Sequence, residues 1–460
     1  MTKSNETKKP IDAFFDEEYL GYAKYVVENR AIPSVIDGFK PTQRKIIYAA
    51  NRVWKSGNEK PLKVFQLAGT VAATTYYHHG NSSLEGAIIG MAQDFKNSMP
   101  LFQGIGQFGS LKSPQAGAPR YVGVKLNENF KLLYKDFELL TPRYEEGEEI
   151  EPSYFLPIVP AVLLNGSSGI AVGFSTNILN RHPIDLVDAC LDALGDKKRI
   201  REIKPWIKGF SGTFSKATDG GENTWNIKGC YEIKNTTTVE VTEIIPGYTF
   251  EDYENHLNAL VEKGILTSYD DNSSGAQIHY TLKFTRAKLA ELIEKERLEN
   301  VLKMQARESE NLTTLDETGK LKIFNSTEEI VRYFVAFRLA YYQKRKDFII
   351  NQLKRELTIL SNRARFIKGI IDGKIRVNKV KKDVVIKCLE ELRFDKVDES
   401  FNYLLNMAIY SLTLERYEQL LKEVEEKKAE LEEIKKADTR DMYKQDLVDL
   451  RKKLEKDLKK

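Results

Sequence analysis

Two apolar stripes in the last third of the sequence constrain the fold more than any other feature of this chain. After Ser326 the sequence becomes strongly helical. The first stripe repeats at alternating intervals of four and three residues, as in a coiled-coil seam, and consists of Leu353, Leu357, Leu360, Ala364, Ile367 and Ile371. The second keeps this rhythm with one lysine out of place, and consists of Tyr417, Leu420, Val424, Lys427, Leu431 and Ile434.

A compact helical segment at residues 384–412 separates the two stripes. Its apolar residues include Phe394, Phe401, Leu404, Leu405 and Met407. Because two independent surface helices would leave their leucine stripes exposed to water, we expect the stripes to pack antiparallel and to carry the compact segment at their tip. This predicts an outgoing coiled-coil arm over residues 326–383, a knob over 384–413 and a returning arm over 414–460.

The first part of the chain is predicted to be helical and then to turn into strands. Residues 1–12 are polar and are expected to be disordered. Apolar periodicity predicts helices over residues 17–30, 41–54, 62–73 and 82–95. Helix, short glycine-containing turn, helix and then strands is the pattern of a winged helix-turn-helix, a DNA-docking module, although an ordinary small helical domain fits this pattern equally well. We assign this domain to residues 13–148.

Residues 149–325 differ in character from the segments on either side. Strand-like runs at residues 236–245 and 276–284 lie between turns rich in Gly, Asn and Ser, which indicates a separate α/β domain. A chain of 460 residues accommodates about three domains of ordinary size. The predicted fold class is therefore α+β, mainly helical.

The bulk composition excludes several classes of protein. No run approaches the roughly 20 apolar residues that a membrane span needs, and the polar N-terminus has no apolar signal core. Cys190, Cys230 and Cys388 are odd in number and far apart, which argues against a disulfide framework or a cysteine-based metal site. The net charge of +4 is small, so a nucleic-acid-binding surface would need local clusters of charge. We expect a reduced, cytoplasmic protein without a membrane segment.

Arg120 and Tyr121 are the first candidates for a reactive pair, at the start of a strand-like run. A tyrosine oxygen is a poor nucleophile while protonated, but a permanently charged guanidinium beside it can hold and neutralise a phosphodiester that the phenolate attacks. With 22 Tyr and 71 Lys and Arg residues in the chain, however, such a dipeptide also arises by chance on a strand edge. The pair alone leaves both interpretations open.

Other candidate residues also have purely structural interpretations beside a functional one. Lys40, Arg44 and Lys45 at a helix start suit phosphate neutralisation, but a solvated charged face fits them as well. His78 and His79 have no cysteine or third histidine nearby, which argues against zinc and leaves a capping or core role open.

A glycine-rich segment at residues 165–170 permits close backbone approach. No Lys-Ser/Thr follows it as in a nucleotide-binding phosphate loop. From its local pattern alone, Ile170 at the end of this segment would be a core residue.

Several motifs, in order along the chain, together resemble the DNA breakage-reunion part of a type IIA DNA topoisomerase. They lie at residues 31–45, 77–84, 103–109, 118–121, 164–177, 205–213, 341–346 and 401–405. The resemblance covers nearly the whole chain. It implies a winged-helix DNA-binding domain, an α/β tower domain over residues 149–325, and a long antiparallel coiled coil whose helical knob forms a dimeric exit gate.

The resemblance also implies roles for individual residues. Tyr121 would be the nucleophile that forms a 5′-phosphotyrosyl linkage, and Arg120 would stabilise the transition state. Ile170 would be the wedge that intercalates and bends the DNA. The remaining expected DNA contacts are Arg30, Lys40, Arg44, Lys45, His79 and Ser82.

The branch of the family is suggested by motif details and by where the motifs start and stop. His78-His79-Gly80 and the runs at 205–210 and 341–346 look more eukaryotic than bacterial. Eukaryotic members carry ATPase and metal-binding domains upstream, whereas this chain starts just before the first DNA-binding helix. The bacterial breakage-reunion subunits add a C-terminal domain, whereas this chain stops at the returning arm. The combination points to the bacteriophage branch, and the missing wrapping domain favours relaxation and decatenation over supercoiling.

The expected cofactors and partners follow from what the sequence lacks. It has no Walker-type phosphate loop and no Asp-x-Asp-x-Asp cluster, and Asp270-Asp271 is a turn pair. We therefore expect Mg²⁺ and ATP to be held by a partner subunit. The expected partners are double-stranded DNA, a second copy of the chain and this ATPase subunit, in the host cytoplasm if the chain is viral. A non-catalytic DNA-bending protein and a coiled-coil scaffold are the alternatives.

Overall fold

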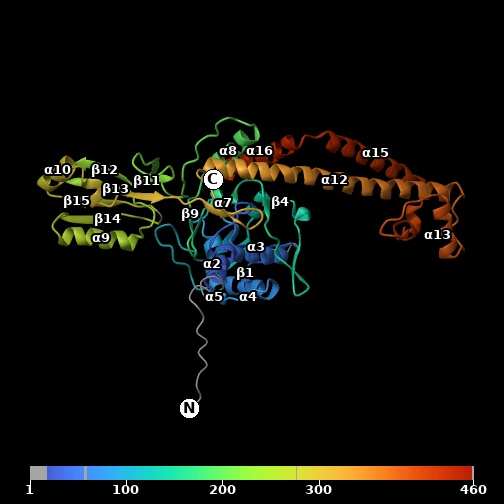
Figure 1. The fold of residues 1–460 in the computed structure, drawn as a ribbon, viewed down its shortest axis with the longest axis horizontal. Helices are drawn as coiled ribbons and strands as arrows, with labels where there is room; N and C mark the ends of the chain where they lie inside the picture. The colour runs from blue at the N-terminus through green and yellow to red at the C-terminus, as the bar shows by residue number, and fades with distance from the viewer. Residues whose placement is uncertain (1–17, 56–59, 276, 458–460) are drawn as a thin grey trace, which may run out of the picture. The chain divides into compact units, whose positions relative to one another are not determined.

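The computed structural model describes residues 18–55, 60–275 and 277–457 (Figure 1). They form two compact units, one from the residues up to 338 together with those from 446 onward, and one from residues 339–445. Helices and strands are both abundant, which agrees with the predicted α+β class. The predicted disorder of residues 1–12 lies outside the described residues.

Four helices begin the first unit, and they match the four predicted ones with shifted ends. They are α2 (Leu20–Val26), α3 (Pro41–Trp54), α4 (Val64–Thr74) and α5 (Asn81–Ala92). The helix expected over 17–30 ends in a π-helical turn, η2 (Val27–Ala31). The helix expected from residue 62 begins two residues later, because Leu62 and Lys63 pair with Val124 and Gly123 as a short strand.

A small antiparallel sheet packs with these helices, and its strands β2 and β3 flank the segment of Arg120 and Tyr121 in sequence. Its order is β1 (Leu62–Lys63), β3 (Gly123–Leu126) and β2 (Phe102–Ile105). The strand-like run predicted after Tyr121 is therefore β3, the central strand. Phe102 and Val124 are fully buried in it, so the sheet is anchored in the core of the first unit.

The rest of this region surrounds an aromatic cluster. Tyr134 stacks on Phe39 with ring centroids 5.2 Å apart and on Phe130 at 5.1 Å, and its hydroxyl donates to the backbone oxygen of Asp37. The cluster holds the loop before α3. The elements here are α6 (Glu128–Leu133), β4 (Tyr134–Lys135), η3 (Phe137–Leu139), β5 (Arg143–Glu145), β6 (Glu148–Ile150), β7 (Leu156–Pro157), α7 (Ala161–Asn165), β8 (Ser167–Ile170), β9 (Ser175–Ile178) and α8 (Pro183–Leu194).

A second α/β body within the first unit is built on a four-stranded antiparallel sheet. Its order is β12 (Cys230–Asn235), β13 (Thr238–Glu243), β15 (Tyr280–Lys283) and β14 (Ser268–Asp271). The strand-like runs predicted at 236–245 and 276–284 contain β13 and β15, and residue 276 lies outside the described part. Two helices, α9 (Phe250–Glu262) and α10 (Arg286–Glu294), and the short α11 (Leu298–Val301) cover the sheet with apolar side chains.

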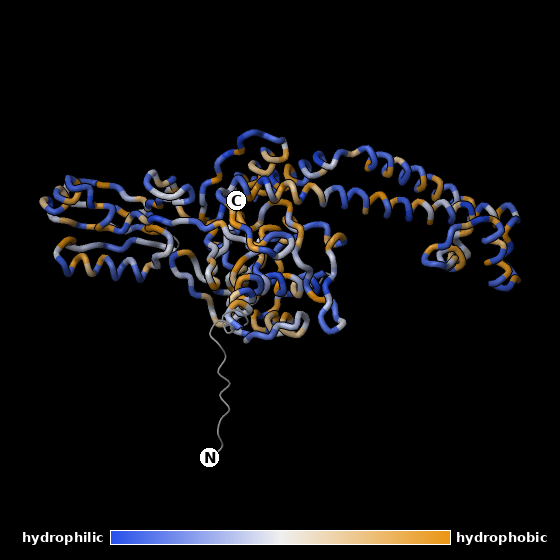
Figure 2. The backbone as a smooth tube through the Cα atoms, in the orientation of Figure 1, coloured by the Kyte–Doolittle hydropathy of each residue, from blue (hydrophilic) through white to orange (hydrophobic). Residues whose placement is uncertain are grey.

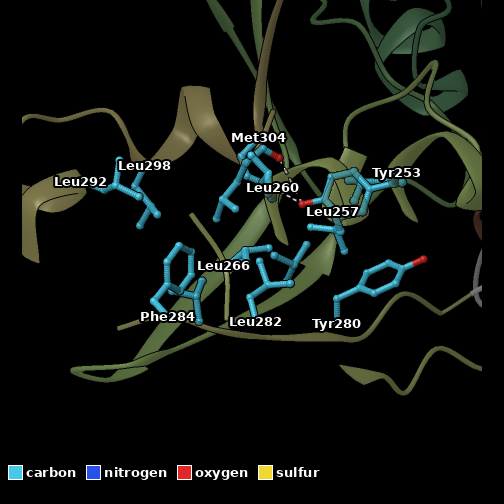
Figure 3. Close-up of a cluster of buried hydrophobic side chains, with 14 of the residues drawn as sticks. Tyr253, Leu257, Leu260, Leu266, Tyr280, Leu282, Phe284, Leu292, Leu298 and Met304 are labelled. Atoms are coloured by element: carbon cyan, nitrogen blue, oxygen red, sulfur yellow. Dashed lines mark hydrogen bonds between the residues drawn. The ribbon is translucent and has the colours of Figure 1, made fainter. Parts of the chain in front are cut away.

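Figure 3 shows the core of this body, where leucines of the helices meet Leu282 and Phe284. The Tyr253 hydroxyl donates to the backbone oxygen of Leu302 at 3.1 Å, so its polar end is satisfied inside an apolar core. The flanking strands are β10 (Thr213–Lys216), β11 (Thr224–Lys228) and β16 (Gln305–Ser309), which form one sheet, and the pair β17 (Thr313–Leu315) and β18 (Leu321–Ile323).

The second unit contains the two predicted stripes, on α12 (Thr327–Ile371) and α15 (Leu414–Lys436), which run antiparallel. Ala364 and Ile367 of α12 pack with Leu420 of α15. The lysine that breaks the second stripe, Lys427, reaches across to Glu356 at 3.1 Å, so it pairs with a charge instead of leaving a gap in the seam. Along both helices, hydrophobic segments recur between longer hydrophilic ones (Figure 2).

Two details of this unit differ from the predicted arms. Ile371 is 47% exposed and lies beyond the buried part of the seam. The returning helix is interrupted at Ala437, whose backbone is extended, and a new helix, α16 (Thr439–Asp457), starts with Asp438 accepting the backbone N–H of Arg440. The spacing of apolar residues does not predict such a helix end followed by a new, capped helix start, because the capping residue is polar.

The knob region has its own small core of Phe366, Ile375, Val385, Leu389, Phe394, Phe401 and Leu404. Its elements are α13 (Lys382–Glu391), α14 (Asn402–Leu405) and η4 (Ile409–Ser411). Across the described ranges, none of the helices is both long and apolar enough to cross a membrane.

Candidate functional site

Arg120 and Tyr121 lie in a tight turn directly before β3. The backbone N–H groups of Tyr121 and Val122 both donate to the Ala118 oxygen, at 2.8 and 3.3 Å. Tyr121 is 68% exposed, which is unusual for so large an aromatic residue, and Arg120 is exposed beside it. The Arg120 Cζ atom lies 5.0 Å from the centroid of the Tyr121 ring, a cation–π contact. The turn thus presents a phenol and a guanidinium together to solvent.

The backbone of this turn is fixed by the start of α4. The N–H groups of Val64 and Phe65 donate to the oxygens of Val122 and Pro119, at 3.1 and 3.3 Å. The Lys63 ammonium donates to the backbone oxygen of Tyr121 at 2.7 Å. Sequence reasoning did not single out Lys63, because its approach to Tyr121 depends on the pairing of β1 with β3. The side chain of Tyr121 is therefore free while its backbone is held.

Ile170 stands at the end of β8, in the β8–β9 hairpin, and is 87% exposed. The core position suggested by its local pattern is therefore wrong. The next two residues of the hairpin, Ala171 and Val172, pack instead against the cluster that includes Val26 and Ala31. The hairpin turns these neighbours inward and leaves the isoleucine in solvent.

The hairpin rests directly on the loop before α3. A Cβ at Gly169 would clash with the backbone oxygen of Ala31, so only glycine permits this close approach. The Lys40 ammonium donates to the backbone oxygen of Ser168 at 2.6 Å, and partial burial lowers the pKa of Lys40. These contacts fix the base of the hairpin that carries Ile170.

Three of the predicted DNA contacts share a surface hollow of about 510 Å³. Arg30, Lys40 and His79 line it together with Asn29, Thr42, Gln43, Tyr77, Gly80, Ser83 and Ala87. The His79 Nε2 atom is hydrogen-bonded to the Tyr25 hydroxyl at 2.9 Å. Ser82 is exposed in the first turn of α5, next to this lining. The hollow gathers cations and hydrogen-bonding groups on one surface.

Arg44, one of the predicted DNA contacts, is largely buried. Its side chain is only 9% exposed, and its Nε and Nη2 atoms bind the two carboxylate oxygens of Asp37 at 2.7 and 3.0 Å. The same carboxylate accepts the N–H groups of Phe39 and Phe155. Arg44 therefore braces the loop before α3 instead of facing solvent.

Lys45, another predicted DNA contact, is also held by neighbouring groups. Its ammonium donates to the backbone oxygen of Thr75 at 2.5 Å and pairs with Glu151 at 3.0 Å. Its side chain is 17% exposed. From sequence, Lys40, Arg44 and Lys45 formed one cationic group, but only Lys40 lines the hollow that also contains Arg30 and His79.

The remaining metal and thiol candidates do not form a site within the described part of the chain. His78 is exposed and lies 4.0 Å from Glu145. No group of three or more His, Cys, Asp or Glu residues that could hold a metal is found among the described residues. The three cysteines are unbonded to one another, and burial raises the pKa of the Cys190 thiol.

Comparison with known proteins identifies the family. The family model for the A-type subunits of DNA gyrase and topoisomerase IV matches residues 30–449. The chain belongs to this family. The resemblance inferred from the motifs is thereby confirmed, and the Arg120–Tyr121 turn and the Ile170 hairpin are features of a gyrase/topoisomerase IV family member.

This chain covers a different share of the length of each topoisomerase relative. The DNA topoisomerase medium subunit of Enterobacteria phage T4 is 35% identical over 430 residues, which cover 92% of this chain and 95% of the phage protein. The mitochondrial DNA topoisomerase 2 of Dictyostelium discoideum is 32% identical over 436 residues, 92% of this chain but 33% of that protein. The chain thus spans about a third of the length of such eukaryotic relatives.

A solved structure supports the same assignment. The crystal structure of the Plasmodium falciparum topoisomerase II DNA-binding, cleavage and re-ligation domain matches with a TM-score of 0.85 and 32% identity. The match covers 97% of this chain and 65% of that one. The matched region therefore includes residues of both described units.

Proposed function

We propose that the chain is the DNA breakage-reunion subunit of an ATP-dependent type II DNA topoisomerase. It makes a transient double-strand break, lets a second duplex pass and reseals the break, which relaxes and decatenates DNA. The names of its relatives and the near-complete overlap with the phage T4 protein support this proposal. The observation that carries it is the exposed Tyr121 with the Arg120 guanidinium over its ring, on a backbone fixed by α4.

The proposed reaction exchanges one phosphate ester for another. The Tyr121 oxygen loses its proton and attacks a DNA phosphorus; a bond from phosphorus to the phenolic oxygen forms, the bond to the 3′ oxygen breaks, and that oxygen takes up a proton. The 5′ phosphate stays on Tyr121 until the 3′ oxygen attacks in reverse, so resealing needs no outside energy. Arg120 offsets the negative charge that develops on the phosphate oxygens.

Neighbouring residues hold and bend the DNA in this proposal. Arg30, Lys40, His79 and Ser82 contact the backbone from the hollow and the first turn of α5. Ile170 enters between two base pairs and bends the duplex. Its exposure and the firm base of its hairpin support this role, since a wedge must protrude and must not yield.

The proposed domain roles follow the order of the chain. Residues 13–148 act as the winged-helix cleavage domain and 149–325 as the tower, while the arms carry the knob of 384–413. The knob pairs with its twin in a homodimer to form the exit gate. Exposed apolar side chains on and beside the knob support this pairing: Val384 is 54% exposed, Tyr410 87% and Leu414 59%.

Magnesium and ATP are assigned to a partner subunit. The described residues offer no carboxylate cluster that fits a magnesium ion, so no step of the reaction is routed through a metal held by this chain. We propose that a separate ATPase chain supplies both the metal-binding carboxylates and ATP hydrolysis. The complex would act in the cytoplasm, that of the host if the chain is viral.

Reconstitution tests the proposed function. The isolated chain should bind DNA but cleave it poorly, and adding the ATPase subunit with Mg²⁺ should restore cleavage and ATP-dependent relaxation. Efficient relaxation by this chain alone would contradict the division of labour. Elution from a sizing column at the mass of one chain, 52.7 kDa, would contradict the homodimer.

The exposed wedge also suits a non-catalytic DNA-bending protein, the second candidate. Such a protein would bend DNA through Ile170 but form no covalent adduct. Replacing Tyr121→Phe separates the two functions: an enzyme loses protein-linked DNA ends while it keeps DNA binding, whereas a bending protein has no such ends to lose.

A further inference from the structure

A buried ion pair joins the segment that leads to Tyr121 to the second α/β body. The Lys112 ammonium lies 3.0 Å from the Glu243 carboxylate, and the two side chains are only 4% and 7% exposed. Lys112 also donates to the Ile244 oxygen at 3.0 Å. The partners are separated by more than 130 positions in sequence, so the contact exists only because the fold brings the two bodies together.

The ion pair has further hydrogen-bond partners around it. Glu243 also accepts the backbone N–H and the hydroxyl of Ser211, both at 3.0 Å, and the N–H of Ile244. The Lys112 backbone oxygen accepts the N–H of Phe250 at the start of α9. Burial lowers the pKa of Lys112, and the Glu243 carboxylate opposes that shift. A buried charge is retained at such a place only when its geometry is well satisfied.

The segment that carries Lys112 is held rigidly at its base. Ser110 and Ser113 close a tight turn by exchanging backbone hydrogen bonds, with Lys112 inside it. The Gln93 side-chain amide donates to the oxygens of Phe108 and Pro114, at 2.8 and 2.9 Å, and so clamps the two ends of the turn. Lys112 therefore acts on the residues after Pro114 through a braced turn and not through a flexible loop.

The segment between residues 106 and 122 thus has three fixed points. Gln93 holds its middle, Lys112 ties it to the second α/β body, and α4 holds its end at Pro119–Val122. Its only described side-chain ion pair to that body is Lys112–Glu243. Because catalytic geometry tolerates errors of well under 1 Å, a change at this tie should reach Tyr121.

We propose that Lys112 and Glu243 are positioning residues for strand cleavage, which set the place of the Arg120–Tyr121 turn relative to the second α/β body. This inference rests on the proposed function. Neither residue touches the DNA phosphate; they act through the 106–122 segment.

The test compares three variants in the complex reconstituted with the ATPase subunit. Lys112→Met removes the ammonium but keeps most of the length of the side chain. Glu243→Gln removes the charge while its amide oxygen can still accept from Ser211, so this variant keeps the fold if Lys112→Met does not. Lys112→Arg restores a cation. The matched control is Lys135→Met. Lys135 is a partly buried lysine that lies outside the 106–122 segment and pairs with Asp446 at 2.8 Å.

The readouts separate positioning from stability. At saturating DNA, Lys112→Met and Glu243→Gln should form the covalent adduct about 10- to 100-fold more slowly, with DNA affinity changed less than about twofold, and Lys112→Arg should recover part of the rate. Lys135→Met should cleave at the wild-type rate. Cleavage by both Lys112→Met and Glu243→Gln at the wild-type rate, or a loss matched by Lys135→Met, would overturn the inference. If wild-type protein forms no tyrosine-linked DNA, the proposed function itself fails, which is a different outcome.

Discussion

The guanidinium of Arg120 lies over the ring of Tyr121, 5.0 Å from its centroid, and both side chains face solvent. This arrangement leaves the phenolic oxygen open at the edge of the ring while a fixed positive charge stays within reach of any phosphate that the oxygen attacks. The backbone contacts to Lys63, Val64 and Phe65 keep the pair in place. The pair therefore has the exposure, charge and rigidity that attack on a DNA strand requires.

Removal of the guanidinium should slow cleavage far more than it weakens binding. We expect Arg120→Ala to lower the single-turnover rate of adduct formation by about 100- to 1,000-fold, because a charged donor to the transition state is lost. Arg120→Lys should fall between wild type and Arg120→Ala, since it keeps the charge but not the planar fork. Lys131→Ala, at an exposed lysine of α6, is the control and should cleave normally. An Arg120→Ala variant with an unchanged rate would remove Arg120 from the reaction.

Shortening the exposed isoleucine should change the DNA and not the protein. Because Ile170 is 87% exposed, Ile170→Ala should change the free energy of unfolding by less than about 0.5 kcal/mol. The bend of a bound duplex, measured by energy transfer between dyes at its ends, should decrease. Ile323→Ala, at a 60% exposed isoleucine of β18, should leave the bend unchanged. Equal bending by Ile170→Ala and wild type would contradict the wedge.

Arg44 should behave as a structural residue. Arg44→Met leaves the Asp37 carboxylate buried without its cation, so we expect the free energy of unfolding to fall by about 3–5 kcal/mol in urea denaturation. Lys24→Met is the matched control, because it breaks an exposed pair with Glu28 and should cost less than about 1 kcal/mol. Full stability of Arg44→Met, together with weaker DNA binding, would contradict the structural role and support Arg44 as a DNA contact.

Acid should remove the stabilisation that Asp192 provides. Hydrogen bonds from Arg201 first, and then from Lys197, lower the pKa of Asp192 to about 2 against the opposing effect of burial. Since the folded-state pKa lies below the unfolded value of about 3.9, the contribution is complete above that value and is lost as the pH falls towards 2. Asp192→Asn should therefore be about 2 kcal/mol less stable than wild type at pH 6 and equally stable near pH 2.

The exposed Asp219, paired with Arg307, supplies the control for this pH dependence. Asp219→Asn should show little difference from wild type at either pH, because the pair is open to solvent. A deficit of Asp192→Asn that stays constant from pH 6 to pH 2 would contradict the assignment to its ionised carboxylate.

Much of the fold could be predicted from local patterns, because it depends on local physics. Pro41 at a first turn marked the start of α3, and the spacing of the two stripes anticipated the apolar contacts of Ala364 and Ile367 with Leu420. Element ends were less predictable. Lys63 became a strand residue because it meets Gly123, sixty positions away, and no local signal encodes that pairing.

The sequence motifs indicate candidate site residues but not the surroundings of those residues. The motifs pointed to Arg120, Tyr121 and Ile170, and all three are exposed. The pairing of Arg44 with Asp37 was not predicted, because a cation at a helix start looks the same whether it faces solvent or a buried carboxylate. The burial of Asp37 depends on the aromatic cluster around Tyr134. The tie between Lys112 and Glu243 was beyond sequence reasoning for the same reason.

The most direct test of the account identifies the amino acid that is joined to DNA. The chain is reconstituted with Mg²⁺ and its ATPase subunit, cleavage complexes are trapped with denaturant, and the DNA-linked peptide is mapped by mass spectrometry after nuclease digestion. We expect a nucleotide adduct on Tyr121 alone, absent from Tyr121→Phe although that variant still binds DNA. An adduct on another residue, or one that persists in Tyr121→Phe, would contradict it.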